Sequence, residues 1–258
     1  MIRIGIDVGG TFTDIVAVAK DGTVTFTKAA STPQDPSIGV MDAVTRLAEE
    51  MGQDVASLLT QTERIVHGTT VATNALLERK GAKVGLLTTK GHRDVLEMRE
   101  GLKDERYNMR LAAPDALVPR HLRLGVAERM RPEGVAHMPL DLASLDTAID
   151  TLRAADVTSV SVCYLHSYKN AAHEQATRVR LEERMPGISI SLSSEVFPEI
   201  KEYERVSTTV VNAYVRPVVE QYLTNLETRL KEAGFAGSVL IILSHGGVAP
   251  IPEAIRLA

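Results

Sequence analysis

The stretch IGIDVGGTFTD occupies residues 4–14: an apolar run that ends in Asp7, then two glycines and a threonine. A second β-prone run follows at once over residues 15–19. Glycines bring backbone N–H groups close to a ligand, because no Cβ stands in the way. Backbone amides, the Thr11 hydroxyl and the Asp7 carboxylate together suit a nucleotide phosphate with Mg²⁺. The alternative is a plain hairpin turn, since Gly-Gly between two strands is a common hairpin signal.

The rest of the chain alternates between strand and helix patterns. Three strands joined by short turns predict an antiparallel meander over residues 3–8, 12–19 and 24–29. Asp35 is the expected cap of the next helix, and Gly81 the expected C-cap of a later one. Strands are predicted at 64–66, 83–88, 122–130, 159–164, 188–192 and 239–243, and helices at 36–51, 69–80, 141–154, 171–185 and 198–233, the last with a break near residue 217. This order predicts a mixed α/β fold.

Composition limits the class of protein. The 258 residues have a formal net charge of −4, which gives no basic surface for nucleic acid or an anionic membrane. A single cysteine excludes an internal disulfide, and the chain opens directly in a strand with no charged leader, so we expect a cytoplasmic protein. Residues 102–139 are rich in Arg, Pro and Asp, and we interpret them as an excursion that carries specificity or as a solvated connector.

A second motif, His67-Gly68-Thr69-Thr70, follows an apolar strand and opens a helix. Glycine and threonines at a helix N-terminus form an anion site, while ordinary capping by threonine is the simpler alternative. Two such turns in one chain, both at strand ends, favour phosphate chemistry.

The two motifs, DVGGTFTD and VHGTTVATNALLERKGAKVGLLTTKGHRDVLEMR, together resemble the hydantoinase/oxoprolinase family. The similarity continues through residues 160–174, 194–223 and 244–249 and thus spans nearly the whole chain. That family includes ATP-dependent N-methylhydantoinases, 5-oxoprolinases and the acetone and acetophenone carboxylases. The resemblance implies a ribonuclease-H-like half of the actin/hexokinase type, with an inserted or following small α/β region.

The resemblance also assigns roles to residues of the two motifs. It implies that phosphates contact Gly9, Gly10, Thr11 and Thr13, and that Asp7 lies near Mg²⁺. Thr69 and Thr70 are the expected catalytic residues of an active-site wall, together with Asp7. Asn74 either joins them or forms a cross-link within its helix.

The resemblance divides the chain into an actin-like N-terminal domain at 1–185 and the start of the hydantoinase/oxoprolinase domain at 186–258. No second DxGGT-like turn occurs, so we expect catalysis to need a missing C-terminal half or a second subunit, in a protein that associates. The implied reaction is ATP-dependent opening of a cyclic amide. The alternatives are ATP-dependent carboxylation of a ketone and a non-catalytic assembly module.

Other residues are weaker candidates. The seven histidines show no paired metal spacing, and His166 is interpreted as structural rather than as a base. Cys163 is expected in the core. Residues 199–205 form an expected solvated helix face, with Glu202 or Arg205 as alternatives for a role at the cleft. In the excursion, Arg106, Tyr107 and Arg110 either meet a substrate carboxylate or lie on the surface.

Overall fold

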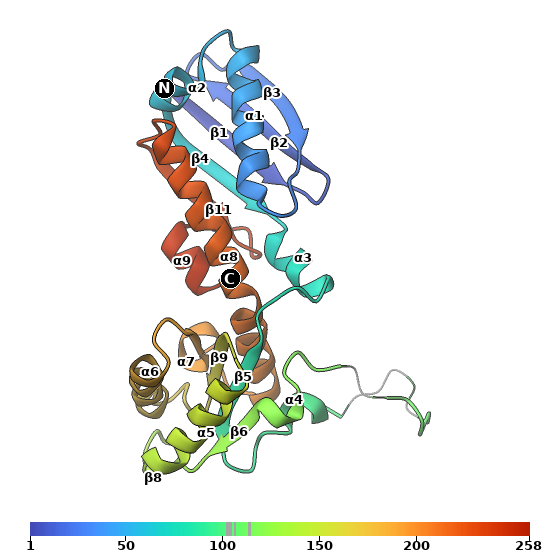
Figure 1. The fold of residues 1–258 in the computed structure, drawn as a ribbon, viewed down its shortest axis with the longest axis vertical. Coiled ribbons are helices and arrows are strands. Elements are labelled where there is room, and N and C mark those ends of the chain that lie inside the picture. The colour runs from blue at the N-terminus through green and yellow to red at the C-terminus, as the bar shows by residue number, and fades with distance from the viewer. Residues whose placement is uncertain (102–104, 106, 113–114) are drawn as a thin grey trace. The chain divides into compact units, whose positions relative to one another are not determined.

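The computed structural model describes residues 1–101, 105, 107–112 and 115–258, which divide into two compact units. Unit 1 comprises residues 1–80 and 218–258, and unit 2 comprises residues 81–217 (Figure 1). Unit 2 is therefore inserted in the sequence of unit 1. The family resemblance predicts a boundary at residue 186 between two family regions. That boundary does not coincide with the division into compact units, and it stays a prediction.

Unit 1 is built on a six-stranded sheet in the order β12-β11-β4-β1-β2-β3. β1 pairs antiparallel with β2, and β2 with β3, which confirms the meander. β4 and β11 extend the sheet in parallel from β1, so the expected ribonuclease-H-like α/β half is confirmed. The elements of this unit are β1 (Ile2–Val8), β2 (Phe12–Ala19), β3 (Val24–Ala30), α1 (Pro36–Glu50), α2 (Val55–Gln61), β4 (Thr62–Thr69), α3 (Val71–Leu77), β11 (Ser238–Ile242), β12 (Val248–Pro250) and α9 (Ile251–Arg256).

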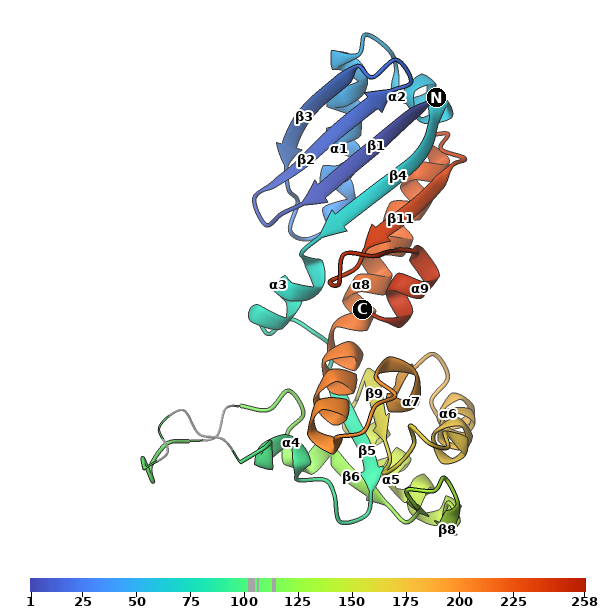
Figure 2. The ribbon, with the colours of Figure 1, turned by 180° about the vertical axis from the view of Figure 1, so that it is seen from behind.

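The alternation of side chains in β1 gives this sheet two different faces. Ile2, Ile4, Ile6 and Val8 are buried and belong to one core with α1 and the second half of α8. The residues between them face the other way, because successive strand residues point to opposite faces. Figure 1 shows α1 in front of β1–β3, and Figure 2 shows the opposite face of these strands toward the viewer.

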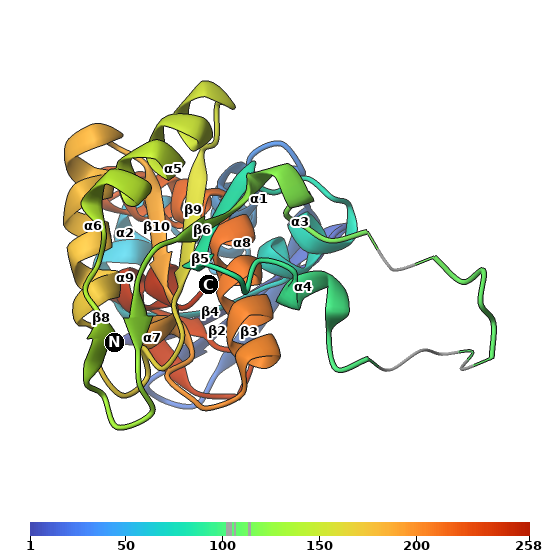
Figure 3. The same ribbon diagram turned by 90° about the horizontal axis from the view of Figure 1, so that it is seen from below.

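Unit 2 contains a parallel four-stranded sheet in the order β10-β9-β5-β6. Helices α5 and α6 lie side by side in this unit (Figure 3). All six residues of β5 and all five of β9 are buried, as expected for parallel strands covered on both faces. The elements are β5 (Val84–Thr89), α4 (Val95–Met98), η1 (Arg120–Leu122), β6 (Arg123–Val126), β7 (Arg129–Met130), β8 (Ala136–Met138), α5 (Leu142–Ala154), β9 (Ser159–Cys163), α6 (Ala172–Arg184), β10 (Ser189–Leu192) and α7 (Ser193–Val196).

Helix α8 (Glu202–Glu232) belongs to both units, and the division falls after Pro217. The break expected near Pro217 is wrong, because the helix continues through it. The expected strand over 122–130 is also wrong as one element: it divides into η1, β6 and β7.

Gly81 does not cap a helix. α3 already ends at Leu77, and the left-handed residue after it is Arg79, with φ of 56°. At Gly81 an added Cβ would lie 2.2 Å from Tyr214 Cε1, so glycine is required there by close packing.

Candidate functional site

The two glycine-threonine motifs meet at one edge of the unit 1 sheet. β1 and β4 are parallel neighbours, and their register sets Asp7 beside Gly68 and Val8 beside Thr69. The Thr70 backbone N–H donates to the Val8 carbonyl at 3.2 Å, and its Oγ1 donates to the same oxygen at 3.3 Å. Parallel pairing thus brings together residues that lie some sixty positions apart in the sequence.

The first motif forms the hairpin turn between β1 and β2. Gly9 N–H donates to the Phe12 carbonyl at 3.0 Å, so this amide is engaged within the turn. Within the described part of the chain, the N–H groups of Gly10 and Thr11 donate to no protein atom. Neither glycine has a positive φ. An added Cβ on Gly9 would lie 3.2 Å from Phe12 O. Glycine is therefore used here because the two backbone segments approach closely, and not because the turn is left-handed.

Thr13 supports this turn from inside. Its side chain is fully buried, and its Oγ1 lies 3.2 Å from Ser31 Oγ. Ser31 Oγ in turn donates to the Gly9 carbonyl at 2.8 Å. The sequence motif did not reveal Ser31, which comes from the far end of the meander. This placement of Thr13 does not support the direct phosphate contact expected for it.

Asp7 and Asp14 lie directly opposite each other across the β1–β2 hairpin, and both are exposed. Directly opposed side chains on antiparallel strands are about 5 Å apart at Cβ, where two like charges destabilise the pair. An added Cβ on Gly68 would lie 3.4 Å from Asp7 Oδ1, so glycine leaves the space beside this carboxylate open. Two carboxylates with open space suit Mg²⁺, which keeps several waters and binds through one or two carboxylates and substrate phosphates. The alternation of β1 and β2 would have revealed Asp14.

The second motif ends β4 and begins α3. Thr69 Oγ1 accepts from Val71 N–H at 3.2 Å, whereas Thr70, the N-cap residue, makes no capping bond with its side chain. Asn74 Nδ2 donates to Thr70 Oγ1 at 3.2 Å, which is the cross-link within the helix expected as one alternative. A Cβ added to Gly10 would lie 3.9 Å from Asn74 Nδ2, so Asn74 also borders the first motif. α3 has only seven residues, and the helix N-terminus is therefore not the main feature of this site.

His67 begins the second motif and forms a buried pair with Tyr222 of α8. Their exposed fractions are 0% and 3%, and His67 Nε2 lies 2.7 Å from the Tyr222 hydroxyl. The rings meet edge to face with centroids 5.7 Å apart. Burial lowers the pKa of His67 to about 4, so the ring is neutral at pH 7. We infer that Tyr222 donates to Nε2, because burial raises the pKa of the tyrosine hydroxyl.

The pair predicts a pH dependence of stability. The folded pKa of His67, about 4, lies below the ordinary value of 6.5. As pH falls through this window the unfolded chain takes up a proton that the folded chain does not, so stability decreases. The loss is about 3 kcal/mol over the window. In His67→Gln this part of the pH dependence is expected to disappear. The measurement is urea unfolding at pH 7 and pH 4.5, with exposed His121→Gln as control. If the free energy of unfolding changed with pH equally in the wild type and in His67→Gln, His67 would take up its proton as readily in the folded as in the unfolded state.

In unit 2 the structure corrects the interpretation of residues 199–205 as a solvated face. Lys201 and Glu204 do form the expected surface pair at 3.0 Å. Arg205, however, is only 1% exposed, and its Nη1 donates to the Tyr164 carbonyl at 2.7 Å and to Ser193 Oγ at 2.8 Å. Ser193 Oγ donates to buried Glu174 at 2.6 Å. Arg205 is therefore part of a buried polar network.

The remaining candidates lie as follows. Cys163 is buried in β9, and burial raises the pKa of its thiol to about 12, which confirms it as a core residue. His166 is partly exposed, and its Nδ1 lies 3.3 Å from the Tyr168 hydroxyl. Tyr107 is 91% exposed and Arg110 is exposed, whereas Arg106 lies outside the described residues.

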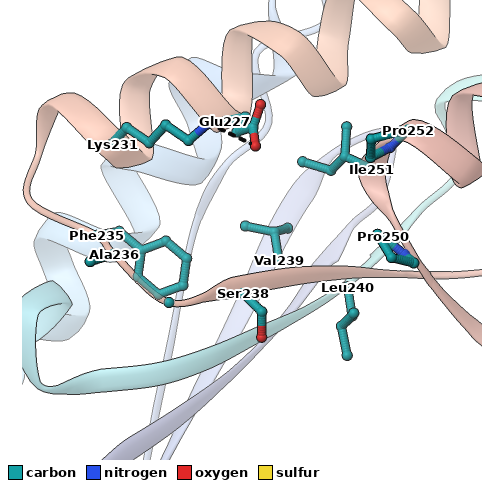
Figure 4. Close-up of a pocket in the computed structure, with 11 residues that line it drawn as sticks. Glu227, Lys231, Phe235, Ala236, Ser238, Val239, Leu240, Pro250, Ile251 and Pro252 are labelled. Carbon is teal, nitrogen blue, oxygen red and sulfur yellow. Dashed lines mark ion pairs between the residues drawn. The ribbon is translucent and has the colours of Figure 1, made fainter.

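Unit 1 also contains a pocket of about 290 Å³ between α8, β11 and the start of α9 (Figure 4). A Glu227–Lys231 ion pair of 2.9 Å borders it on the helix side. Phe235, Val239 and Ile251 give it an apolar lining. The lining shares no residue with the two motifs, so this pocket is separate from the candidate site.

The model of the hydantoinase/oxoprolinase N-terminal region matches residues 3–185, and that of the hydantoinase/oxoprolinase domain matches residues 205–258. The chain belongs to the hydantoinase/oxoprolinase family. In this family member the first match contains both motifs that meet at the edge of the unit 1 sheet.

Relatives of this hydantoinase/oxoprolinase chain include several named enzymes. The caprolactamase alpha subunit of Pseudomonas jessenii is 39% identical over 96% of this chain and 36% of its own length. The acetophenone carboxylase gamma subunit of Aromatoleum aromaticum is 35% identical over 96% of this chain and 36% of its own length. The chain thus spans about a third of the length of these relatives.

Solved structures of the same family agree with the fold. ATP-dependent caprolactamase from Pseudomonas jessenii superposes with a TM-score of 0.88 at 39% identity, covering 96% of this chain and 36% of that one. Nucleotide-free acetone carboxylase also gives a TM-score of 0.88, at 30% identity, covering 96% and 37%. Among the described residues, no helix combines the length and apolar character needed to cross a membrane.

Proposed function

We propose that this chain is the ATP-binding part of an ATP-dependent enzyme that opens cyclic amides. The observation that carries the proposal is the meeting of the Asp7 and Thr69–Thr70 motifs at the ends of parallel strands β1 and β4. Ligands of open α/β sheets bind at such carboxyl ends. Relatives named caprolactamase and 5-oxoprolinase support a cyclic amide as substrate.

The residues present fit a nucleotide phosphate with Mg²⁺. The amides of Gly10 and Thr11 would donate to a phosphate, and the Thr11 hydroxyl would add a third donor. Asp7, with Asp14 opposite, would hold Mg²⁺ through its water shell. When bound, Mg·ATP supplies the phosphoryl group that activates the amide carbonyl. Thr69 and Thr70 would line the side of this site formed by β4.

In this proposal the protein acts by positioning and by electrostatic stabilisation. A phosphoryl-transfer site must hold both ends of the triphosphate, and this chain has one DxGGT turn. The rest of the site would come from a further part of the protein or from a partner subunit. Relatives named as subunits support a partner, and we propose that the working form is an oligomer.

The second candidate is ATP-dependent carboxylation of a ketone. It is favoured by the matches to acetophenone carboxylase and acetone carboxylase. Both candidate reactions use the same phosphate site at the turn after β1. They can therefore be distinguished only by the substrate that stimulates ATP consumption. A third candidate, a non-catalytic assembly module, is disfavoured because the site keeps its aspartate, glycines and threonines.

The proposal is tested by calorimetric titration of Mg·ATP into the protein. We expect saturable binding to the wild type and at least about tenfold weaker binding to Asp7→Ala, because the variant lacks the carboxylate nearest the metal. Asp21→Ala, in the exposed turn before β3, is the matched control and should bind like the wild type. Equal binding to Asp7→Ala and the wild type would reject the phosphate site.

A separate assay distinguishes the substrates. ATP consumption by the full-length protein with its partner is measured with caprolactam, 5-oxoproline or hydantoin, and with acetone or acetophenone plus bicarbonate. Stimulation by a cyclic amide alone supports the hydrolase, and stimulation by a ketone with bicarbonate supports the carboxylase. ATP binding with no stimulation by any of them would favour the assembly module.

A further inference from the structure

Three polar side chains stand at matching positions after the parallel strands of unit 2. His92 follows Thr89, the last residue of β5, by three positions, Arg129 follows Val126 of β6 by three, and His166 follows Cys163 of β9 by three. β6, β5 and β9 are parallel neighbours, so these segments leave the sheet at the same edge. This edge belongs to unit 2 and contains none of the residues assigned above to the phosphate site.

Two of the three side chains are in contact. Arg129 Nη1 lies 3.1 Å from His92 Nε2, and both residues are partly buried. Burial and then the Arg129 charge lower the pKa of His92, so its neutral ring accepts from Arg129 at Nε2 and keeps a proton at Nδ1. The strand order β9-β5-β6 sets the segment of His92 between those of His166 and Arg129, and the negative charges of Glu202 and Glu128 partly oppose the lowering of the His92 pKa.

Arg129 differs from the ion-paired arginines of unit 2. Among the described residues of this unit, six arginines form ion pairs with carboxylates: Arg120, Arg123, Arg153, Arg178, Arg180 and Arg184. In the described ranges no carboxylate lies within ion-pair distance of Arg129, which contacts an imidazole instead. A guanidinium presents N–H donors in a planar fork that matches a carboxylate or a phosphate.

The third side chain is held by a buried scaffold. His166 has φ of 57°, a left-handed conformation that is rare for a non-glycine residue and costs about 1–2 kcal/mol. Leu165 N–H donates to Thr89 Oγ1 at 3.0 Å, and Thr89 donates to buried Glu128. On the other side of the turn, Arg205 Nη1 donates to Tyr164 O and Ser167 Oγ. Strained residues held in this way are characteristic of ligand sites.

We propose that Arg129, His92 and His166 bind one anionic group of a small molecule, a carboxylate or a phosphate. Arg129 supplies the charge and the planar donor fork, and the two imidazoles supply further N–H donors. Glu202 opposes anion binding through its negative charge. Its neutralisation in Glu202→Gln should therefore strengthen binding, whereas loss of the guanidinium should weaken it.

The test is a titration of the chain, labelled with ¹⁵N-histidine, with inorganic phosphate in one arm and glutarate in the other at pH 7.5. We expect the imidazole signals of His92 and His166 to shift saturably in at least one arm. The arm with the tighter binding identifies the ligand as a phosphate or a carboxylate. In Arg129→Gln the dissociation constant should rise about tenfold or more, because a charge-assisted hydrogen bond is lost.

Arg131→Gln is the matched control, since Arg131 also contacts an imidazole, with Nη2 3.0 Å from His137 Nδ1 on an exposed hairpin. It should leave the dissociation constant unchanged. Asp7→Ala should also leave the shifts of His92 and His166 unchanged, which separates this site from the phosphate site of unit 1. Arg129→Lys keeps the positive charge but lacks the planar set of N–H donors, so it should also weaken binding. It replaces Arg129→Gln in the test if that variant does not fold. Absence of saturable shifts in both arms, or equal binding by the wild type and the Arg129 variants, would overturn the proposal.

Discussion

Replacing Asp7 by Asn in the full-length enzyme is expected to lower ATP-dependent turnover about 10³-fold. Asparagine has nearly the same shape but removes the charge that would hold Mg²⁺ beside Gly68. Removal of one preorganised electrostatic contact costs about 10²–10³-fold in turnover. The metal also orients the transferring phosphoryl group, which places the effect at the upper end of that range. The measurement is steady-state ATP hydrolysis at saturating cyclic amide.

The companion variants separate this effect from a general loss of structure. Asp21→Asn should keep wild-type turnover, because Asp21 lies in an exposed turn away from both motifs, where it accepts from Thr23 N–H at 3.0 Å. Asp14→Asn should lower turnover less than Asp7→Asn, and it should slightly stabilise the metal-free protein by removing the opposed charge. An Asp7→Asn enzyme that turns over at the wild-type rate would remove Asp7 from the mechanism.

The largest effect on stability is expected for Arg205→Met, a loss of about 3–5 kcal/mol in the free energy of unfolding. Arg205 is 1% exposed, and one guanidinium nitrogen bonds Tyr164 O, Ser167 Oγ and Ser193 Oγ. Methionine would leave these three buried acceptors without their charged donor, and it would disturb the bond from Ser193 Oγ to buried Glu174. Urea unfolding of the wild type and the variant measures the difference.

Lys201→Met is the control for removing a cation from the same segment. Its pair with Glu204 lies at the surface and is screened by solvent, so the expected change in the free energy of unfolding is much smaller than for Arg205→Met. Arg205→Lys should recover only part of the stability, since an ammonium does not reproduce the guanidinium geometry. Unfolding curves of Arg205→Met and Lys201→Met that coincide would show that the network contributes nothing to stability.

The parts of the fold predictable from the sequence are those governed by local pattern. Alternation in residues 2–19 fixes both strands of the first hairpin, and Asp35 caps α1 by accepting from Ser37 N–H at 3.1 Å. The glycines and threonines that follow two strands also indicate both motifs of the candidate site. Their roles in binding and catalysis remain predictions.

The parts not predictable depend on partners distant in the sequence. Arg205 stands in a charged run typical of a solvated helix, and only its contacts with Tyr164 and Ser193 make its burial favourable. Nothing local indicates that Ser31, eighteen residues away, contacts the Thr13 hydroxyl, and the phosphate contact of Thr13 stays a prediction. Strand β12 and helix α9 are short and have weak patterns, so the hairpin through Gly246 was missed.

Cys163 is the only thiol of this chain, and it is 2% exposed within the central part of the unit 2 sheet. A thiol with its pKa raised to about 12 forms almost no thiolate while the unit is folded. Its alkylation rate in the chain therefore measures how often unit 2 opens, without an introduced label. Ligands that close the unit should slow this reaction, and those that bind only unit 1 should affect it little.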